Sequence, residues 1–415
     1  MSKANIKQAI QLKLGKKSLY YVTRDVERAA AGLLLGIPNY FIITNVSPYS
    51  TELKKIYPQN IFCISNISNK GEVLDTLELL KSGETKKIIN KGDNILVFKN
   101  TIQIEKICQD NDWSLLNPRA ELANQVEEKI SQIEWLGPLA KYLPKYKIEI
   151  CKNIHWDNNN FVLQFNRSHT GSGTILITSK KQLEEIKEKF PDREARVAEY
   201  IPGPLFTNNN IVWGNEILMG NISYQITGLR PFTDLPFATI GNDWKLPHKI
   251  LNADQIIKYK KIATAVGQRL AKQGWKGLFG IDTIMNEEDG ELYLLEINAR
   301  QPASTTYESE LQLMTAFEKT SPPSAPEPTL LTTFTAHLLA LLEIPYSDQK
   351  IIAIDNGSQI IQRVLLDKKM GIDKKLQKSS NLIIYNNTKP GSDLFRYQFR
   401  EGIMKEHNKL NFYDK

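Results

Sequence analysis

Residues 277–285 read Gly277-Leu-Phe-Gly-Ile-Asp-Thr-Ile-Met285, and residues 291–300 read Glu291-Leu-Tyr-Leu-Leu-Glu-Ile-Asn-Ala-Arg300. The segment between them, Asn286-Glu-Glu-Asp-Gly290, has the composition of a turn, so we expect a β-hairpin. Asp282 and Glu296 each lie seven residues from position 289. Pairing about that position therefore places Asp282 opposite Glu296.

The predicted hairpin brings oxygen ligands together. Alternation along the second strand puts Glu296, Asn298 and Arg300 on one face. Two carboxylates and an amide oxygen suit Mg²⁺, which keeps several waters and completes its shell with nucleotide phosphates. A half-exposed strand with scattered acids is the alternative interpretation. It explains the turn acids at 287–289, but not Asp282 and Glu296, because an unpaired acid inside an apolar strand is costly to bury.

Composition favours a globular protein that works in a reducing compartment. The chain has 415 residues, of which 41% are hydrophobic and 24% charged, and its net charge is +7. Three separated cysteines show neither zinc spacing nor a disulfide framework, so we expect a cytoplasmic protein. No signal peptide or transmembrane run is evident, and basic residues cluster only in pairs. We therefore expect neither a membrane nor a nucleic acid as partner, whereas a modest positive charge suits polyanionic substrates such as ATP.

Residues 1–115 alternate between β-prone and helical segments, which predicts a parallel, doubly wound unit. No GxGxxG follows the first expected strand, so the dinucleotide fingerprint is missing. Expected strands cover residues 18–23, 40–44, 60–65 and 94–98, and expected helices cover residues 24–35 and 73–80.

The remaining chain reads as mixed helices and strands. We expect helix over 121–141, strands around a glycine-rich turn in 146–200 with a helix over 179–190, and strands in 210–228. An amphipathic helix is expected over 254–272, with Ile256, Ile257, Ile262, Val266 and Leu270 on its apolar stripe. Residues 318–328 read as a linker or surface loop, and residues 330–415 as a helix followed by several strands.

The motifs of residues 115–305, taken in order, resemble those of the ATP-grasp superfamily. The D…E-x-N-x-R part is specific, whereas the earlier segments are individually weak. The resemblance implies an α/β (α+β) fold in three parts: a doubly wound pre-ATP-grasp domain over 1–115, a two-subdomain ATP-grasp domain over 116–305 with its hinge near 196–203, and a C-terminal β-rich extension over 306–415. The extension is expected to close the active site, pack as a module or form a homodimer surface.

The resemblance also assigns a nucleotide site. Lys129 would reach toward phosphate, and a strand ending in a glycine-rich loop would close over the triphosphate. Glu199 and the backbone of Tyr200 and Ile201 would contact adenine, with Leu295 and Trp213 as apolar walls. The strand and loop residues expected near the phosphates are Gln164, Arg167, Ser168, His169, Thr170, Gly171, Ser172 and Gly173.

Two departures from the family pattern concern the nucleotide. The family usually has a phosphate-contacting lysine on the strand before the loop, where this chain has Gln164, with Arg167 as a nearby substitute. An acid for the ribose hydroxyls often follows the hinge, where this chain has Leu205-Phe-Thr-Asn208.

The chemistry implied is ATP-dependent ligation. ATP would phosphorylate a carboxylate, and an amine would attack the acylphosphate, with Asp282, Glu296 and Asn298 holding Mg²⁺ (two ions expected, Mn²⁺ able to substitute). Arg300 is a candidate to hold the acceptor carboxylate or stabilise the acylphosphate, and a structural salt bridge is its alternative. Arg230 is a candidate for substrate recognition, with a solvated loop arginine as the alternative.

Three functional hypotheses remain open at this stage. The leading one is a carboxylate–amine ligase whose substrates are small molecules such as amino acids or peptides. A biotin-carboxylase-like carboxylating enzyme is compatible with Glu-x-Asn-x-Arg, although no Met-Lys-Met carrier target is present. A nucleotide-binding pseudoenzyme or regulatory subunit is suggested by Gln164 and opposed by the intact Asp–Glu–Asn set.

Overall fold

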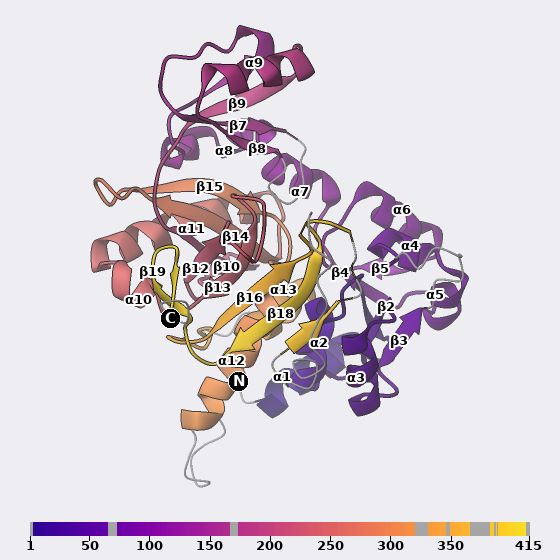
Figure 1. The fold of residues 1–415 in the computed structure, drawn as a ribbon. Coiled ribbons are helices and arrows are strands. Elements are labelled where there is room, and N and C mark those ends of the chain that lie inside the picture. The colour runs from indigo at the N-terminus through magenta and orange to yellow at the C-terminus, as the bar shows by residue number, and fades with distance from the viewer. Residues whose placement is uncertain are drawn as a thin grey trace.

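The computed structural model describes residues 3–64, 73–166, 173–319, 331–345, 349–365, 382–385, 387 and 389–411. Three larger β-sheets organise these residues, and helices cover them (Figure 1). The chain is a mixed α/β protein, as the sequence predicts. Among the described residues, no helix combines the length and apolar character needed to cross a membrane.

The N-terminal unit is built on a five-stranded parallel sheet of order β3-β2-β1-β4-β5. Helices between the strands cover both faces, which confirms the doubly wound prediction. Its elements are α1 (Lys3–Leu14), β1 (Leu19–Val22), α2 (Glu27–Leu34), β2 (Tyr40–Asn45), α3 (Pro48–Ile56), β3 (Ile61–Ile64), α4 (Thr76–Lys81), α5 (Gly83–Ile88), β4 (Asn94–Val97), α6 (Ile102–Asp110) and β5 (Ser114–Leu115).

The helix expected over 121–141 is broken. It consists of α7 (Ala120–Glu127), α8 (Ser131–Leu136) and a 3₁₀ helix η1 (Gly137–Tyr142). The first break falls at Glu128, whose backbone is extended. Sequence periodicity missed this break because apolar residues continue at helical spacing through it. The break places Lys129 in a connection between helices rather than on a helix surface.

A small antiparallel sheet of order β6-β9-β7-β8 forms a separate layer, at the top of Figure 1. Its strands are β6 (Tyr146–Ile150), β7 (Phe161–Phe165), β8 (Thr174–Ile177) and β9 (Glu194–Glu199), with the short helix η2 (Cys151–Asn153) after β6 and α9 (Lys180–Lys189) before β9. Leu183 of α9 packs in one cluster with Leu163 and Val197, so α9 covers one face of this sheet.

The largest sheet runs in the order β15-β14-β10-β12-β13-β16-β18-β17, with β11 beside β10. Strands from residues 358–399 continue it, so the C-terminal residues share a sheet with the predicted metal-binding hairpin. Its strands are β10 (Leu205–Trp213), β11 (Glu216–Leu218), β12 (Ser223–Thr227), β13 (Thr239–Asp243), β14 (Gly277–Met285), β15 (Leu292–Asn298), β16 (Ser358–Arg363), β17 (Leu382–Ile384) and β18 (Asp393–Phe399). A hairpin of β19 (Met404–Glu406) and β20 (Lys409–Leu410) follows.

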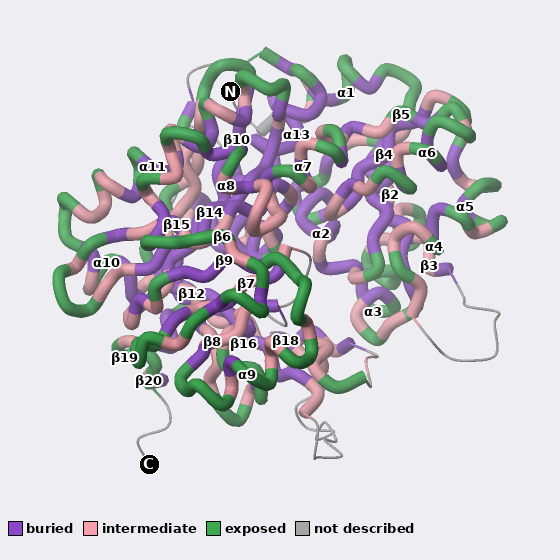
Figure 2. Tube along the Cα trace, turned by 90° about the horizontal axis from the view of Figure 1, so that it is seen from above, coloured by how far each residue is buried: buried purple, intermediate pink, exposed green. Residues whose placement is uncertain are grey.

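Helices bury both faces of the large sheet. Val266 of α11 (Ala253–Lys272) packs with Phe279 on one face, and Leu338 of α13 (Thr333–Leu341) packs with Leu278 on the other. The α13 cluster includes residues of α1 and α2 and so joins the N-terminal unit to the sheet. Figure 2 shows the buried residues concentrated along these central strands. The remaining helices are α10 (Pro247–Ile250) and α12 (Thr305–Lys319).

The structure corrects one local prediction and describes only the start of another. Ile257 is 63% exposed, so its place on the apolar stripe of 254–272 is wrong. The predicted Ile262, Val266 and Leu270 are buried, and Tyr259 joins them. Ile257 falls on the solvent side of a helix with 3.6 residues per turn. The linker predicted over 318–328 begins in the last turn of α12, and its residues 320–328 lie outside the described residues.

Candidate active site

Asp282 on β14 pairs directly with Glu296 on β15, in the register expected from the sequence. Asn298 pairs with Gly280 on the same two strands. The Nδ2 amide of Asn298 donates to Oδ2 of Asp282 at 3.1 Å. Asp282 and Asn298 are both buried, whereas the Glu296 side chain is 35% exposed. The three oxygen-bearing groups therefore line one patch that is open on the Glu296 side.

A β-bulge lies between the Asp282 and Thr283 pairs. Asp282 pairs with Glu296, but Thr283 pairs with Leu294, so Leu295 is the extra residue on β15. A bulge lets consecutive side chains leave the strand in similar directions. Leu295 and Glu296 are both half-buried, in agreement with this geometry.

Lys129 reaches this patch from the break between α7 and α8. Its Nζ lies 2.9 Å from Oε1 of Glu296. Asn166, at the end of β7, holds the break in place: its Oδ1 accepts from the backbone N–H of Ile130 at 2.9 Å, and its Nδ2 donates to Glu128 at 2.9 Å. The lysine is thus positioned from the small sheet as well as from α7.

The electrostatics of the patch suit a bound cation. Burial, and then the neighbouring Glu296 carboxylate, raise the pKa of Asp282 to about 6. Oδ1 of Asp282 is buried and has no hydrogen-bond partner among the described residues. A divalent cation would satisfy this oxygen and relieve the repulsion between the two carboxylates. The described residues hold no group of three His, Cys, Asp or Glu side chains that could bind a metal, so an amide oxygen is the third candidate ligand.

Arg300 lies just beyond the patch and forms an ion pair with Glu127 of α7. Lys99 binds the other Glu127 oxygen at 2.5 Å. Burial alone would raise the pKa of Glu127, but Arg300 and Lys99 lower it overall. The Arg300 guanidinium also lies 5.9 Å from the centre of the Phe98 ring. The predicted alternative, a structural salt bridge, therefore exists, and the side chain remains 27% exposed beside it.

No model of a known protein family and no curated protein sequence matches the chain. Solved structures do match it along nearly its whole length. N5-carboxyaminoimidazole synthetase from Staphylococcus aureus, complexed with ADP, has a TM-score of 0.60 at 13% identity and covers 93% of each chain. Carboxyaminoimidazole ribonucleotide synthase from Aspergillus clavatus, complexed with ATP, has a TM-score of 0.59 at 16% identity and covers 92% of this chain and 93% of its own. L-amino acid ligase from Bacillus licheniformis has a TM-score of 0.57 at 12% identity and covers 93% of this chain and 94% of its own.

The chain has the ATP-grasp fold. The similarity extends over the N-terminal unit and the C-terminal strands as well as the residues whose motifs resemble the superfamily. At these identities it establishes the fold, and the function must be argued from the site.

The ATP-grasp hinge predicted near 196–203 joins the small sheet to the large one. Glu199 ends β9 and is exposed, Tyr200 is half-buried and Ile201 is buried. The connection then contacts the β14–β15 turn, where the backbone N–H of Glu287 donates to the Pro202 carbonyl at 3.1 Å. The hinge segment therefore runs beside the strands that carry Asp282 and Glu296.

The glycine-rich loop of the ATP-grasp prediction is only partly described. Gln164 is half-buried, and its Nε2 donates to Oγ1 of Thr174 at 3.4 Å. Gly173 is buried, and its carbonyl accepts from the Phe165 backbone N–H at 3.1 Å. The other predicted loop residues lie outside the described part of the chain: Arg167, Ser168, His169, Thr170, Gly171 and Ser172.

Arg230 is not brought to the carboxylate patch. It is exposed on the connection between β12 and β13, and no contact within the described ranges links it to Asp282 or Glu296. Its neighbour Pro231 instead contacts β16, where its carbonyl accepts from Nε2 of Gln362 at 3.0 Å. A role for Arg230 in substrate recognition stays a prediction.

Sequence reasoning missed several residues that the ATP-grasp fold brings to this region. Glu127 lies two residues before Lys129. That short spacing is the one sequence feature that could have indicated it. Thr207 pairs with Asp282 from β10, which only the strand order reveals. Arg196 is buried on β9 with a charge that the local sequence gives no reason to bury.

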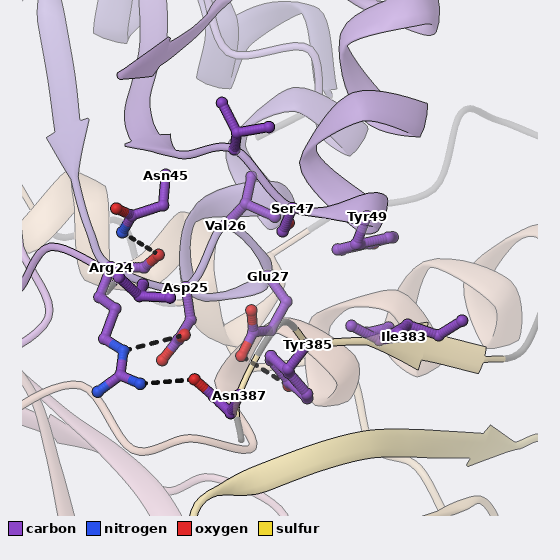
Figure 3. Close-up of a pocket in the computed structure, with 13 residues that line it drawn as sticks. Arg24, Asp25, Val26, Glu27, Asn45, Ser47, Tyr49, Ile383, Tyr385 and Asn387 are labelled. Atoms are coloured by element: carbon purple, nitrogen blue, oxygen red, sulfur yellow. Dashed lines mark hydrogen bonds and ion pairs between the residues drawn. The ribbon is translucent and has the colours of Figure 1, made fainter. Parts of the chain in front are cut away.

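A cavity with charged and polar side chains in its wall lies between the N-terminal unit and β17 (Figure 3). Arg24 lies 3.8 Å from Asp25 and donates to Asn387 at 2.7 Å, while the Tyr385 hydroxyl donates to Glu27 at 2.8 Å. Burial, and then the neighbouring Glu27, raise the pKa of Asp25 to about 7. No sequence motif predicts this cavity, because its walls come from segments more than 350 residues apart.

Proposed function

We propose that this chain is an ATP-dependent ligase that joins a carboxylate to an amine and releases ADP and phosphate. The observation that carries the proposal is the paired Asp282–Glu296 patch with Asn298 beside it and an unpartnered buried Asp282 oxygen. Such a patch fits a divalent cation, and it lies under Lys129 and next to Arg300. Two of the similar structures were solved with ADP or ATP, which supports a nucleotide at the corresponding place.

The residues proposed to hold Mg²⁺ are Asp282, Glu296 and Asn298. A bound Mg²⁺ would neutralise charge on the phosphates during transfer. Lys129, paired with Glu296 at 2.9 Å, is proposed to turn toward phosphate when the nucleotide binds. The proposed nucleotide pocket continues to the hinge, where Glu199, Tyr200 and Ile201 would contact adenine and the half-buried Leu295 would form an apolar wall. The loop over 167–173 is proposed to cover the phosphates.

Arg300 is proposed to orient the acceptor carboxylate. Its guanidinium is fixed by Glu127 and stands on the face of the patch that holds Glu296, where a planar fork can bind a carboxylate through two oxygens. The carboxylate oxygen would attack the terminal phosphorus of ATP to give an acylphosphate and ADP. The amine would then attack the carbonyl carbon, and phosphate would leave as one proton is released from nitrogen.

The cavity of Figure 3, whose volume of about 20 Å³ suits a group the size of one water, is the proposed site for the ammonium group of the amine substrate. Arg28, which follows the cavity residue Glu27, lies 4.2 Å from the Phe98 ring, and Arg300 lies 5.9 Å from the same ring. Phe98 therefore lies against both Arg28, next to the cavity, and Arg300, next to the patch. Asp25, with a pKa of about 7, is suited to accept the proton of an ammonium group at neutral pH.

The proposal is tested by phosphate release from Mg-ATP. Purified protein would be incubated with pools of amino acids or other carboxylates, each with and without an amine pool, and a further arm would replace the carboxylate by bicarbonate. Release that needs a carboxylate supports the ligase. Release only with bicarbonate and an amine would indicate a carboxylating enzyme instead. Measurable ATP binding without release in any arm would indicate a nucleotide-binding pseudoenzyme.

A further inference from the structure

Gln164 and Arg196 are direct partners on neighbouring strands. The antiparallel register of β7 and β9 pairs Gln164 with Arg196, so their side chains stand on the same face of the small sheet. The other face is packed under α9, because Leu163, Ala195 and Val197 join Leu183 in one core cluster. Alternation along both strands therefore turns Gln164 and Arg196 away from α9 and toward the proposed nucleotide side.

Arg196 is a buried cation without a matching anion. Its exposed fraction is 1%, and both Nε and Nη1 lack hydrogen-bond partners among the described residues. None of the ion pairs in the described ranges includes Arg196. Its one aromatic contact within those ranges is with Tyr146, whose ring centre lies 5.6 Å from the guanidinium carbon. Burying an arginine without an acidic partner is costly. Such a group is therefore expected to bind an anion when the protein holds its ligand.

Arg196 is charged and interacts electrostatically with Glu296. Burial lowers its pKa to about 10, and the negative potential of Tyr146 and Glu296 opposes that shift, so the guanidinium remains charged at neutral pH. Because Glu296 is one of the charges that raise the pKa of Arg196, Arg196 lies within electrostatic reach of the carboxylate patch. Gln164, in contrast, is neutral and is engaged with Thr174 of its own hairpin.

We infer that Arg196 supplies the positive charge for the phosphates of ATP that Gln164 does not supply. Arg196 places a cation on β9, on the face of the sheet where Gln164 of β7 stands. This inference rests on the proposed ATP site. It makes Arg196 a ligand of the triphosphate and leaves the adenine contacts to the hinge.

The test compares the binding of ATP and of adenosine, because only ATP carries the phosphates. Arg196→Met is expected to weaken ATP binding about 30-fold, since a hydrogen-bonded charge contact to phosphate is lost, and to leave adenosine binding unchanged. Arg196→Lys keeps the charge, and its affinity for ATP is expected to lie between those of the wild type and Arg196→Met. Equal weakening for ATP and adenosine, or unchanged ATP binding in Arg196→Met, would overturn the inference.

A double variant keeps the test decisive if Arg196→Met does not fold. Gln164→Lys combined with Arg196→Met returns a cation to the same face from β7, and it is expected to bind ATP within about threefold of the wild type. A folded double variant that still binds ATP about tenfold or more weakly contradicts the inference. Failure of the proposed function looks different: the wild type would then bind ATP but release no phosphate with any carboxylate, while the Arg196 effect on ATP binding persisted.

Discussion

The side-chain amide of Asn298 is oriented by Oδ2 of Asp282, which accepts from its Nδ2 at 3.1 Å. This bond directs the amide oxygen of Asn298 away from Asp282 and leaves Oδ1 of Asp282 free for a cation. Asn298 therefore acts twice in our account, as a ligand and as the group that fixes another ligand.

Replacing Asn298 by Ala is expected to raise the Mg²⁺ concentration that gives half-maximal phosphate release by about tenfold or more, since both a ligand and its orienting bond are lost. Thr283→Val is the matched control, because Thr283 is buried next to Asp282 and its hydroxyl has no partner in the described part of the chain. The control should keep the wild-type Mg²⁺ requirement. An unchanged requirement in Asn298→Ala would remove Asn298 from the metal site.

Arg300→Ala is expected to reduce kcat/KM for the carboxylate about 100-fold and to leave ATP binding nearly unchanged, because the guanidinium contacts the acceptor and not the nucleotide. Lys99→Met removes the other cation on Glu127 without touching Arg300, and only a few-fold effect is expected from it. Steady-state kinetics with varied carboxylate measures both. If the two variants behave alike, Arg300 serves only as a structural partner of Glu127.

Glu308 provides a test of stability against pH. It is fully buried on α12, accepts hydrogen bonds from the amide of Asn221, and takes part in none of the ion pairs of the described residues. Burial raises its pKa from 4.5 to about 7. Between these values the folded protein binds more protons than the unfolded chain, so the contribution of Glu308 to stability falls as pH rises.

Glu308→Gln removes this titration. The difference in the free energy of unfolding between the variant and the wild type is expected to shift by about 3 kcal/mol in favour of the variant from pH 4.5 to pH 8. Urea denaturation at both pH values measures the difference, and Glu52→Gln on the exposed surface of α3 serves as control. The same difference between Glu308→Gln and wild type at both pH values would show that Glu308 titrates normally.

Gly203 tests the rigidity of the hinge. Its φ is +148°, and an added Cβ would lie 1.9 Å from the carbonyl oxygen of Met285. Gly214 also has a positive φ, +63°, but a Cβ there would meet nothing within 4 Å. Gly203→Ala is therefore expected to lower the free energy of unfolding by about 3 kcal/mol, and Gly214→Ala by about 1 kcal/mol. Similar losses in the two variants, measured by urea denaturation, would mean that the hinge yields to the added methyl group.

Much of the fold and the centre of the site could be predicted because their signals are local. The register of Asp282 and Glu296 follows from the turn at 286–290 and from apolar alternation on either side. The doubly wound N-terminal unit follows from its alternating segments. In each case neighbouring residues in the sequence determine the structure.

The remainder depends on contacts between distant segments. The break at Glu128, which frees Lys129 to reach Glu296, is fixed by Asn166 from another sheet. The pairing of Arg196 with Gln164 requires the strand order β6-β9-β7-β8, which no local pattern encodes. The same holds for β16, which joins the large sheet through β13 after a separation of more than 100 residues.

Trapping the acylphosphate tests whether this protein phosphorylates a carboxylate with the help of the Asp282–Glu296 patch. The protein would be incubated with Mg-ATP, a carboxylate pool and hydroxylamine in place of the amine, and hydroxamate would be measured for the wild type and for Glu296→Gln. We expect hydroxamate that requires both ATP and a carboxylate, with a loss of about 100-fold or more in Glu296→Gln, because the cation that neutralises the phosphates is no longer held. ATP binding without hydroxamate from any carboxylate, or full hydroxamate formation by Glu296→Gln, would contradict it.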